Sequence, residues 1–490
     1  MRPWIAYGLL FLGAAGLSGL TVLNELNPHD EGLMLQAAAR IADGQLPYRD
    51  FWWNYGPGQP LLLAGLQELF GPSLLPWRVL RALLDAGVAT LAFGLARRAK
   101  AGTPVAVLAW LAAALAMASP TLPSPVPAAT ALALGALLVA RGSPVAAGVL
   151  AGLALAFRID LGLAAVVGAA VSSAERDEWA TLRAVAAAAV AAAVALGPWV
   201  LAGGAGRFWD QTVGFATNLQ GLQRLPLPGA WDDGFDPGRI LDFYVPYVLF
   251  AGVLLWVVEA ARRRPSPTEL AALPLVVAGV LYLLARADEF HRIPLAAVLP
   301  ALLAAAAWRA RAASRAFAVV LALPLVLLAL NGLDRLRIDL FTGPPKQRVD
   351  LPVADGVRAP TREARDLVAL RREVDRLVPP GQAVFVANPR HDRVRVGDPL
   401  LYVLLERPNP TRYDVMQPGV VTTERAQREM VADLESARPE VVIRWVSPVA
   451  DQREDNGSSR STGIRILDDY IARFYRPARR IGDFLVLQRH

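Results

Sequence analysis

The sequence predicts a polytopic α-helical membrane protein with about eleven transmembrane helices and a small C-terminal α/β domain. Of the 490 residues, 54% are hydrophobic, and the mean hydropathy is +0.36. The apolar residues are concentrated in residues 1–331, whereas residues 332–490 have the mixed, charged composition of a water-soluble domain. We therefore divide the chain into a membrane domain, residues 1–335, and a C-terminal domain, residues 336–490.

The spans are predicted from apolar segments of helical composition. They lie near residues 4–23, 79–96, 103–118, 126–140, 144–157, 161–173, 181–202, 241–260, 267–285, 293–307 and 315–331. The apolar segment 59–71 is too short to span, so it predicts a helix that lies along the membrane or dips into it. Segments 144–157 and 161–173 meet at Arg158-Ile159-Asp160, which predicts two short helices joined by a break.

The basic residues between the spans predict the orientation. With a cytoplasmic N-terminus, one side receives the basic loops at 97–100, 141, 176–183, 262–264 and 309–315. The opposite side receives loop 24–78, the Pro-rich turn 119–127, turn 158–160, loop 203–240, turn 286–292 and the C-terminal domain. The sequence thus predicts a multi-pass protein whose C-terminal domain is extracytoplasmic.

The composition also limits cofactors, partners and source. The net charge of +7 reflects topology in the short loops and does not call for nucleic acid. Cysteine is absent, which excludes disulfides and thiolate metal sites. Lys100 and Lys346 are the only lysines in a chain rich in alanine and arginine, which indicates a GC-rich bacterial genome and hence a bacterial plasma membrane.

The first outer loop begins with an Asp-Glu pair within "NPHDEG", residues 27–32. Apolar residues follow at positions 34, 37, 38 and 41, so the sequence predicts a short amphipathic helix in the membrane interface that stops at Gly44. Asp30 stands at the N-cap position and Glu31 in the first turn, where helix capping and the helix dipole favour acids. The alternative is that Asp30 is a general base, with Glu31 orienting a substrate or a metal.

Aromatic and charged residues follow that helix in "PYRDFWWNYGPG", residues 47–58. They suit anchoring at the membrane interface, and they equally suit sugar stacking and phosphate binding. His29, Asp30 and Glu31 suggest a possible divalent metal, although three adjacent residues converge on one ion only in a special turn. The sequence therefore assigns no metal ligand.

Two further polar clusters interrupt the apolar segments at span ends, "FRID" at 157–160 and "RADEFHR" at 286–292. Ionisable groups at membrane depth usually face one another or a cavity. All three clusters fall on the outer side, so we expect them to line one outward-facing polar cavity. The alternatives are an Arg158–Asp160 pair that only hides its own charges, and a solvated turn at 286–292.

The C-terminal domain alternates predicted helices and strands. Helices are expected at 361–377, about 423–437 and about 464–475, and strands at "AVFVA", "EVVIRW" and "DFLVLQR". No Gly-rich phosphate loop precedes a helix, which argues against a nucleotide-sugar site in this domain.

The Asp-Glu pair, the helix ending in Gly and "PYRDFWWNYGPGQPLLLA" together resemble the GT-C superfamily of membrane glycosyltransferases. The resemblance is to the branch with the protein O-mannosyltransferases, the aminoarabinose transferase of lipid A and bacterial RgtA/B/C/D-like proteins. "RADEFHRIPLAAVLPALLA", "LYVLLERPNPTRYD" and "YRPARRIGDFLVLQR" are also similar to segments of bacterial members. The second outer loop departs from the pattern, because "SPTLPSPVP" has no acidic residue; Asp160 is the candidate for that place.

The resemblance implies an enzyme of the cell envelope that moves a sugar from a polyprenyl-phosphate donor in the membrane to an extracytoplasmic protein, lipid or glycan. It implies Asp30 as general base, Glu31 as its support, and inversion of the anomeric centre. The candidates for binding the donor phosphate or sugar are Arg49, Arg158, Arg286, His291, Arg292, Tyr48 and Tyr55. The candidate supporting carboxylates are Asp50, Asp160, Asp288 and Glu289.

The main alternative is a multi-span transporter or flippase of a lipid-linked or small polar substrate. Such a protein is expected to have related halves and charges near the membrane midplane in broken helices. The break near 158–160 fits this alternative weakly, because we find no internal repeat and the carboxylates gather at one surface.

Overall fold

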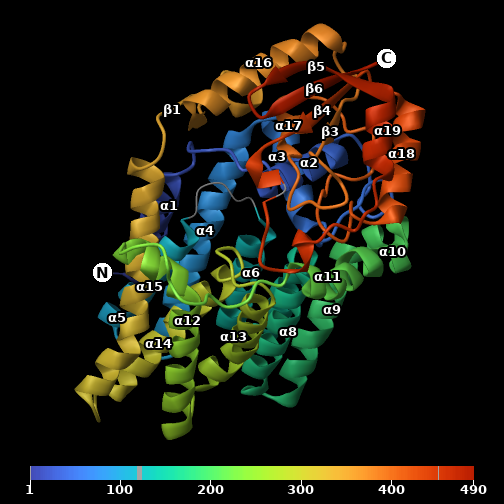
Figure 1. Ribbon diagram of the computed structural model, residues 1–490. Helices are drawn as coiled ribbons and strands as arrows, with labels where there is room; N and C mark the ends of the chain where they lie inside the picture. Colours follow the sequence, from blue (N-terminus) through green and yellow to red (C-terminus); the bar gives the residue numbers. More distant parts are fainter. Residues whose placement is uncertain (1, 119–123, 451) are drawn as a thin grey trace.

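Long apolar helices form the lower part of the molecule in Figure 1, and the residues after the last of them cover their upper ends. The computed structural model describes residues 2–118, 124–450 and 452–490, so part of the predicted turn 119–127 lies outside the described residues. The lower helices are α1 (Pro3–Gly19), α4 (Leu74–Arg98), α5 (Thr103–Met117), α6 (Pro125–Val139), α7 (Pro144–Phe157), α8 (Ile159–Ala174), α9 (Glu178–Gly203), α12 (Pro237–Arg262), α13 (Pro267–Ala285), α14 (Ile293–Ala310) and α15 (Arg315–Phe341).

Each predicted span coincides with one of these helices. In the described part of the chain, six are long and apolar enough to cross a membrane, namely α4, α9, α12, α13, α14 and α15, while α1 and α5–α8 are shorter apolar helices. The number of eleven spans stays a prediction. Helix α15 runs past the predicted end at 331 and through the predicted domain boundary at 335, because its last turns are amphipathic and bury Leu336.

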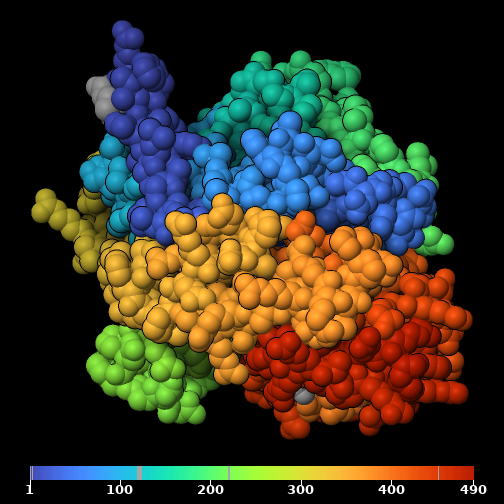
Figure 2. Space-filling view, turned by 90° about the horizontal axis from the view of Figure 1, so that it is seen from above, coloured from blue at the N-terminus to red at the C-terminus, as the bar shows by residue number. Residues whose placement is uncertain are grey.

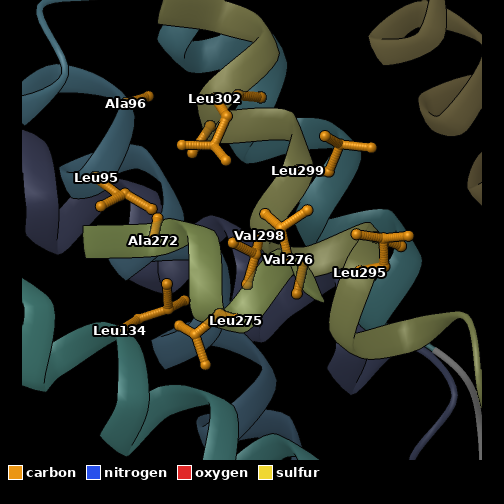
Figure 3. Packing of buried hydrophobic residues seen from close by; sticks show 14 of the residues in the cluster. Leu95, Ala96, Leu134, Ala272, Leu275, Val276, Leu295, Val298, Leu299 and Leu302 are labelled. Atoms are coloured by element: carbon orange, nitrogen blue, oxygen red, sulfur yellow. The ribbon is translucent and has the colours of Figure 1, made fainter. Parts of the chain in front are cut away.

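Most of the lower helices, α4–α8 and α12–α15, share one apolar core, in which α14 is buried almost throughout. Figure 3 shows side chains of this core, including Leu95 of α4, Leu134 of α6, Leu275 of α13 and Leu295 of α14. A helix that is apolar on every face belongs inside a bundle. Turn 286–292, which joins α13 to α14, is therefore attached to the most enclosed part of the bundle.

Small residues bring α7 and α9 into close contact. A β-carbon at Gly148 or Gly152 would collide with the backbone carbonyl oxygens of Ala184 and Ala188. Helices in a membrane pack through such small residues, because lipid provides little hydrophobic force between them.

We expect Gly152→Leu to lower the thermal unfolding temperature of the detergent-solubilised protein, because the added side chain forces α7 and α9 apart. The measurement is thermal unfolding followed by intrinsic fluorescence. Gly87→Ala in α4 is the matched control, since a β-carbon there meets nothing within 4 Å. Equal unfolding temperatures for the two variants would contradict this interpretation of the helix contact.

Shorter helices lie between the bundle and the C-terminal residues: α2 (Asp30–Ala42), α3 (Gly58–Phe70), α10 (Ala205–Trp209), a π-helical turn (Asp210–Gly214) and α11 (Phe215–Gln223). Helix α3 occupies the short apolar segment predicted at 59–71. Helix α2 has the predicted bounds, and most of it is buried in the protein. Its predicted place in the membrane interface stays a prediction.

The polar face of α2 is covered by the C-terminal residues. Arg40 lies 2.6 Å from Asp414 in an ion pair that is almost wholly buried, and it also donates to the carbonyl of Thr411. A β-carbon at Gly32 would collide with the backbone of Leu400. The amphipathic pattern was read correctly, but a protein surface rather than water receives the polar face.

The C-terminal residues form a four-stranded sheet with helices packed on it. The sheet has the order β3 (Phe385–Ala387), β4 (Val441–Trp445), β6 (Phe484–Arg489), β5 (Tyr475–Ile481); β3 and β4 are parallel and the other pairs antiparallel. A two-stranded antiparallel sheet joins β1 (Lys346–Arg348) to β2 (Arg358–Pro360). The helices are α16 (Thr361–Leu377), α17 (Leu400–Leu404), α18 (Glu424–Ala437) and α19 (Ile466–Phe474).

The predicted helices and strands are all present, but β1, β2, β5 and α17 were not predicted. Strand β5 was not predicted, because it is an edge strand whose central residues are all exposed, so it lacks the alternation that identifies a strand.

Seen from above, the orange and red C-terminal residues form a continuous surface between blue and green segments (Figure 2). The C-terminal part thus covers one end of the helical bundle.

Candidate active site

A cavity of about 950 Å³ lies between the helical bundle and the C-terminal part. The bundle contributes the break between α7 and α8 and turn 286–292, and the start of α2 lines the cavity beside them. The C-terminal part contributes Pro360, Arg362, Glu363, Asp366, Arg395, Asp398, Leu400, Trp445, Glu454 and Asp483. The three polar clusters at span ends therefore line one cavity.

Asp30 is the first residue of α2, and it lies half-buried at the cavity wall. Its backbone N–H donates to Asn27 Oδ1 at 2.8 Å, so Asn27 provides the cap that was predicted for Asp30. The Asp30 carboxylate accepts no hydrogen bond from the described residues and forms no ion pair with them. It is therefore free to accept a proton from a ligand.

His29 is buried next to Asp30 and also reaches the cavity. Its Nε2 lies 2.6 Å from the side-chain amide of Gln417. Burial lowers the pKa of His29 below its ordinary value, which favours the neutral imidazole. His29 therefore leaves the charge of Asp30 uncompensated.

Glu31 points away from the cavity, in contrast to its predicted place beside the reacting groups. Its carboxylate is fully buried and is held by Arg78 of α4, at 2.7 Å from Nε and 2.8 Å from Nη2. Arg78 also donates to the carbonyl of Glu25 at 2.6 Å. Glu31 thus fixes the start of α2 to α4, and it can act on Asp30 only through that position.

Arg158 forms the second wall of the cavity. Its guanidinium pairs with Asp160 at 2.6 Å and stacks over the rings of Tyr55, at 5.6 Å, and Tyr282, at 4.6 Å. Its Nη1 donates to the Tyr282 hydroxyl at 3.2 Å. Asp160 does not line the cavity, and its carboxylate pairs with Arg158, as expected if this pair hides its own charges. Arg158 and Tyr55 both line the cavity.

Sequence reasoning missed Tyr282, although it stands in the last turn of α13 directly before the "RADEFHR" cluster. Its ring lies 4.2 Å, centroid to centroid, from that of His291. The two rings and the Arg158 guanidinium form a continuous stack that joins turn 286–292 to the break between α7 and α8. A planar, partly cationic wall of this kind suits a sugar phosphate.

Turn 286–292 is built around Asp288. Its carboxylate accepts from Arg286 at 2.6 Å and lies 2.7 Å from His291 Nδ1. Burial opposes its ionisation, but the hydrogen bonds and charges of His291 and Arg286 lower the pKa of Asp288 to about 2. Glu289 is paired with Arg335 at 2.5 Å and also lines the cavity.

Arg292 is the charged residue of this turn that does not line the cavity. It pairs with Asp242 of α12 at 2.7 Å, and Asn331 of α15 donates to the same carboxylate at 2.9 Å. Its placement as a donor-binding residue is not supported, because it is the N-cap residue of α14 and its side chain points into the contact between α12 and α15.

Tyr48, Arg49 and Asp50 lie away from the cavity as well. They form a tight turn in which Tyr48 is left-handed, with φ of 68°, and fully buried. The Tyr48 hydroxyl donates to the carbonyl of Tyr55 at 2.6 Å, and Arg49 pairs with Asp50 at 2.9 Å on the surface. These three residues shape the loop that carries Tyr55, which is the candidate of this stretch that lines the cavity.

The possible metal at His29, Asp30 and Glu31 has no support from geometry, because Glu31 is held by Arg78 away from the cavity that His29 and Asp30 line. Among the residues that the structure describes, no three His, Asp or Glu side chains converge as metal ligands would. Dependence on a divalent metal stays a prediction without a proposed site.

Carboxylates of the C-terminal part line the cavity opposite the arginines, and the sequence did not indicate them. Burial raises the pKa of Asp398 well above its ordinary value. Burial, with the charges of Glu25 and Asp483, raises the pKa of Glu363 to about 7. The folded protein therefore holds a proton on Glu363 at a pH where the unfolded chain has lost it.

We expect the wild-type protein to lose thermal stability between about pH 5 and pH 8, and Glu363→Gln to lose less of it. The raised pKa of Glu363 stabilises the folded protein fully at a pH below 4.5, the pKa in the unfolded chain. This stabilisation is lost as the pH rises through about 7, the pKa in the folded protein. The unfolding temperature at each pH measures the effect. Glu424→Gln, at an exposed position on α18, is the control; the prediction fails if both variants retain the wild-type slope.

The fold can be compared with solved structures. The crystal structure of ArnT from Cupriavidus metallidurans bound to undecaprenyl phosphate superposes with a TM-score of 0.57 at 15% identity, covering 99% of this chain and 97% of that one. The apo structure of the same protein gives 0.56 at 15% identity with the same coverage. The chain has the GT-C fold.

Over the whole chain, the GT-C fold predicted from the sequence is thus confirmed. The archaeal oligosaccharyltransferase AglB from Archaeoglobus fulgidus, in complex with an inhibitory peptide and a dolichol-phosphate, matches less well, with a TM-score of 0.48, 15% identity, and coverage of 91% of this chain and 70% of that one. No family model matches the sequence, and no curated protein matches it significantly. The likeness is therefore one of fold.

Proposed function

We propose that the protein is an inverting membrane glycosyltransferase that moves a sugar from a polyprenyl-phosphate donor to an extracytoplasmic acceptor. The observation that carries this proposal is the Asp30 carboxylate, unpartnered in the described part of the chain, in a cavity whose other walls hold Arg158 and Arg286. A free carboxylate facing guanidinium groups supplies both a base and an anion-binding surface. The GT-C fold supports the same assignment.

In the proposed reaction, the acceptor hydroxyl attacks the anomeric carbon while its proton passes to Asp30. The bond from the anomeric carbon to the phosphate oxygen breaks, and its electron pair leaves with the polyprenyl phosphate. One displacement of this kind inverts the anomeric centre. The negative charge of Asp30 also stabilises the positive charge that develops on the sugar.

Arg158, Arg286 and His291 are proposed to bind the leaving phosphate. The Arg158 guanidinium is fixed by the rings of Tyr55 and Tyr282, and His291 is oriented through Nδ1 by Asp288. With Nδ1 held by a carboxylate, Nε2 is the ring atom available to a ligand. Residues held in this way lose little side-chain entropy when a phosphate binds.

The proposed orientation places the cavity on the extracytoplasmic side of the bacterial plasma membrane, with a cytoplasmic N-terminus and about eleven spans. The basic residues of the short loops pair at the helix ends remote from the cavity; Arg176 donates to the carbonyl of Gly142, and Arg263 to that of Arg309. The domain division near residue 335 and the extracytoplasmic C-terminal part belong to the same proposal.

The direct test is sugar transfer by the purified full-length protein in lipid vesicles. A radiolabelled sugar on polyprenyl phosphate should pass to an acceptor extract of the cell envelope, whereas the same sugar on a nucleotide should not. A transporter or flippase would move the labelled lipid across the vesicle membrane without breaking the sugar–phosphate bond. Movement without transfer would overturn the proposal.

A further inference from the structure

Arg286 and Arg395 bind one carboxylate together, and that carboxylate belongs to the protein itself. Glu454 accepts from Arg286 Nη1 at 2.9 Å and Nη2 at 2.5 Å, and from Arg395 Nε at 2.9 Å. The side-chain amide of Asn456 donates to the same carboxylate at 3.0 Å. Two guanidinium groups and an amide converging on one anion have the donor set of a phosphate site.

Glu454 lies on a segment that crosses the cavity. We call residues 452–460 the strap. On either side the chain is tied to the C-terminal part, since Arg395 N–H donates to the carbonyl of Ala450 at 2.9 Å and Thr462 N–H to that of Asp392 at 2.9 Å. The ion pair between Glu454 and Arg286 connects the strap to the helical bundle.

The strap also separates the cavity from a smaller one of about 530 Å³. Glu454 lines the large cavity and Asp455 the small one, while Leu225 lines both. The small cavity is mostly apolar; its lining residues are Arg224, Leu225, Pro226, Leu227, Leu283, Leu284, Ala287 and Asp455. A ligand with an apolar chain and a phosphate head would cross from one cavity to the other at Arg286.

Besides the Glu454 ion pairs, Gln452 of the strap accepts from Arg395 Nη1 at 3.0 Å, and the strap packs on α11. A β-carbon at Gly457, in the short 3₁₀ turn Gly457–Ser459, would lie 3.2 Å from the carbonyl oxygen of Gly221. This is a packing contact without charge. Loss of the Glu454 ion pairs would therefore leave the strap with few interactions that hold it over the cavity.

We propose that Arg286 and Arg395 form a phosphate subsite that Glu454 occupies at rest, and that the phosphate of a polyprenyl ligand displaces Glu454 and releases the strap. This inference takes its ligand class from the proposed function and adds to it Arg395 and a competing carboxylate. The phosphate monoester carries more charge than a carboxylate and offers three oxygens to the guanidinium groups, so it can replace Glu454. Binding then includes the free energy needed to open the strap.

The test measures binding and strap release without requiring transfer. Undecaprenyl phosphate is titrated against the full-length protein in detergent, and trypsin cleavage after Arg453 and Arg460, both exposed on the strap, is followed by mass spectrometry. Undecaprenyl phosphate should accelerate both cleavages. Undecaprenol should not, and inorganic phosphate should do so only at much higher concentration; acceleration by undecaprenol would overturn the proposal, because the phosphate would then be irrelevant.

Two variants separate competition from support. Glu454→Gln should bind undecaprenyl phosphate about tenfold more tightly and be cleaved rapidly without ligand, because the closed state no longer competes. Arg395→Gln should bind it more weakly than the wild type. If Glu454 instead only orients Arg286, then Glu454→Gln will bind more weakly, and the proposal is wrong.

Glu429→Gln is the matched control, because that carboxylate also accepts from two side chains, Tyr413 and Arg425, at a place outside the cavity. It should keep the wild-type affinity and cleavage rate. Because the assay involves no sugar, its outcome is independent of catalysis. Strap release in a protein without transferase activity would remove the proposed function alone, and transfer without strap release would remove this inference alone.

Discussion

Asp30→Asn should lower the rate of sugar transfer by about 10²–10⁴-fold, because the amide cannot accept the proton that the attacking hydroxyl must lose. The substitution keeps the size of the side chain, and the helix start stays capped by Asn27. Affinity for undecaprenyl phosphate should stay close to the wild-type value, since Arg158 and Arg286 are unchanged. Initial rates of label transfer and a separate binding titration measure the two quantities.

Asp43→Asn is the control for this prediction. Asp43 is an exposed carboxylate at the other end of α2, so the same chemical change there should leave transfer unchanged. Asp30→Asn with wild-type transfer would remove Asp30 from the reaction. Loss of donor affinity together with transfer would assign Asp30 to binding rather than to proton transfer.

Arg78→Leu should lower the free energy of unfolding by about 3–5 kcal/mol, because it leaves the Glu31 carboxylate buried without a charged partner. Both side chains are within 1% of complete burial, and Arg78 additionally holds the carbonyls of Val22 and Glu25. Chemical unfolding in detergent, or the yield of folded protein if the variant is too unstable, measures the loss. Transfer should fall as well, because the start of α2 carries Asp30.

The double variant Arg78→Leu with Glu31→Gln distinguishes ion pairing from packing. Removing the unpaired charge should restore part of the stability lost in Arg78→Leu. Arg49→Leu, which breaks an exposed pair with Asp50, should change stability little. A double variant no more stable than Arg78→Leu would show that Arg78 acts through its backbone contacts instead of through Glu31.

The helices were predictable because bilayer length and apolar composition leave few alternatives for such segments. Helices α7 and α13 begin and end at the predicted residues, and α16 coincides with the amphipathic pattern at 361–377. That Asp30, Arg158 and turn 286–292 line one cavity was predictable from the order of the helices. Successive helix ends alternate between the two sides of the bundle, and all three polar clusters stand at ends on the same side. Each of these inferences needs only the local sequence and the topology of the spans.

The partners of the charged residues were not predictable in this way. Glu31 and Asp30 are neighbours in sequence with the same side-chain chemistry, yet Glu31 is neutralised by Arg78, 47 positions further along the chain, while Asp30 is not. Arg286 and Arg292 stand at the two ends of the same turn, but Arg286 pairs with Glu454 at the cavity, and Arg292 pairs with Asp242 inside the bundle. The polar face of α2 is equally compatible with a membrane surface and with the buried ion pair that Arg40 forms with Asp414.

The sequence by itself determined which segments are helices, that the polar clusters gather at one end of the bundle, and that one cluster contains a carboxylate pair. Hydrophobic length and charge asymmetry are properties of short segments, so they survive without tertiary information. Only the tertiary structure decided which carboxylate is free, which arginines reach the cavity, and which side chains of the C-terminal part close it. Those outcomes depend on ion pairs between distant parts of the chain, and burial selects the pairs only once the helices have packed.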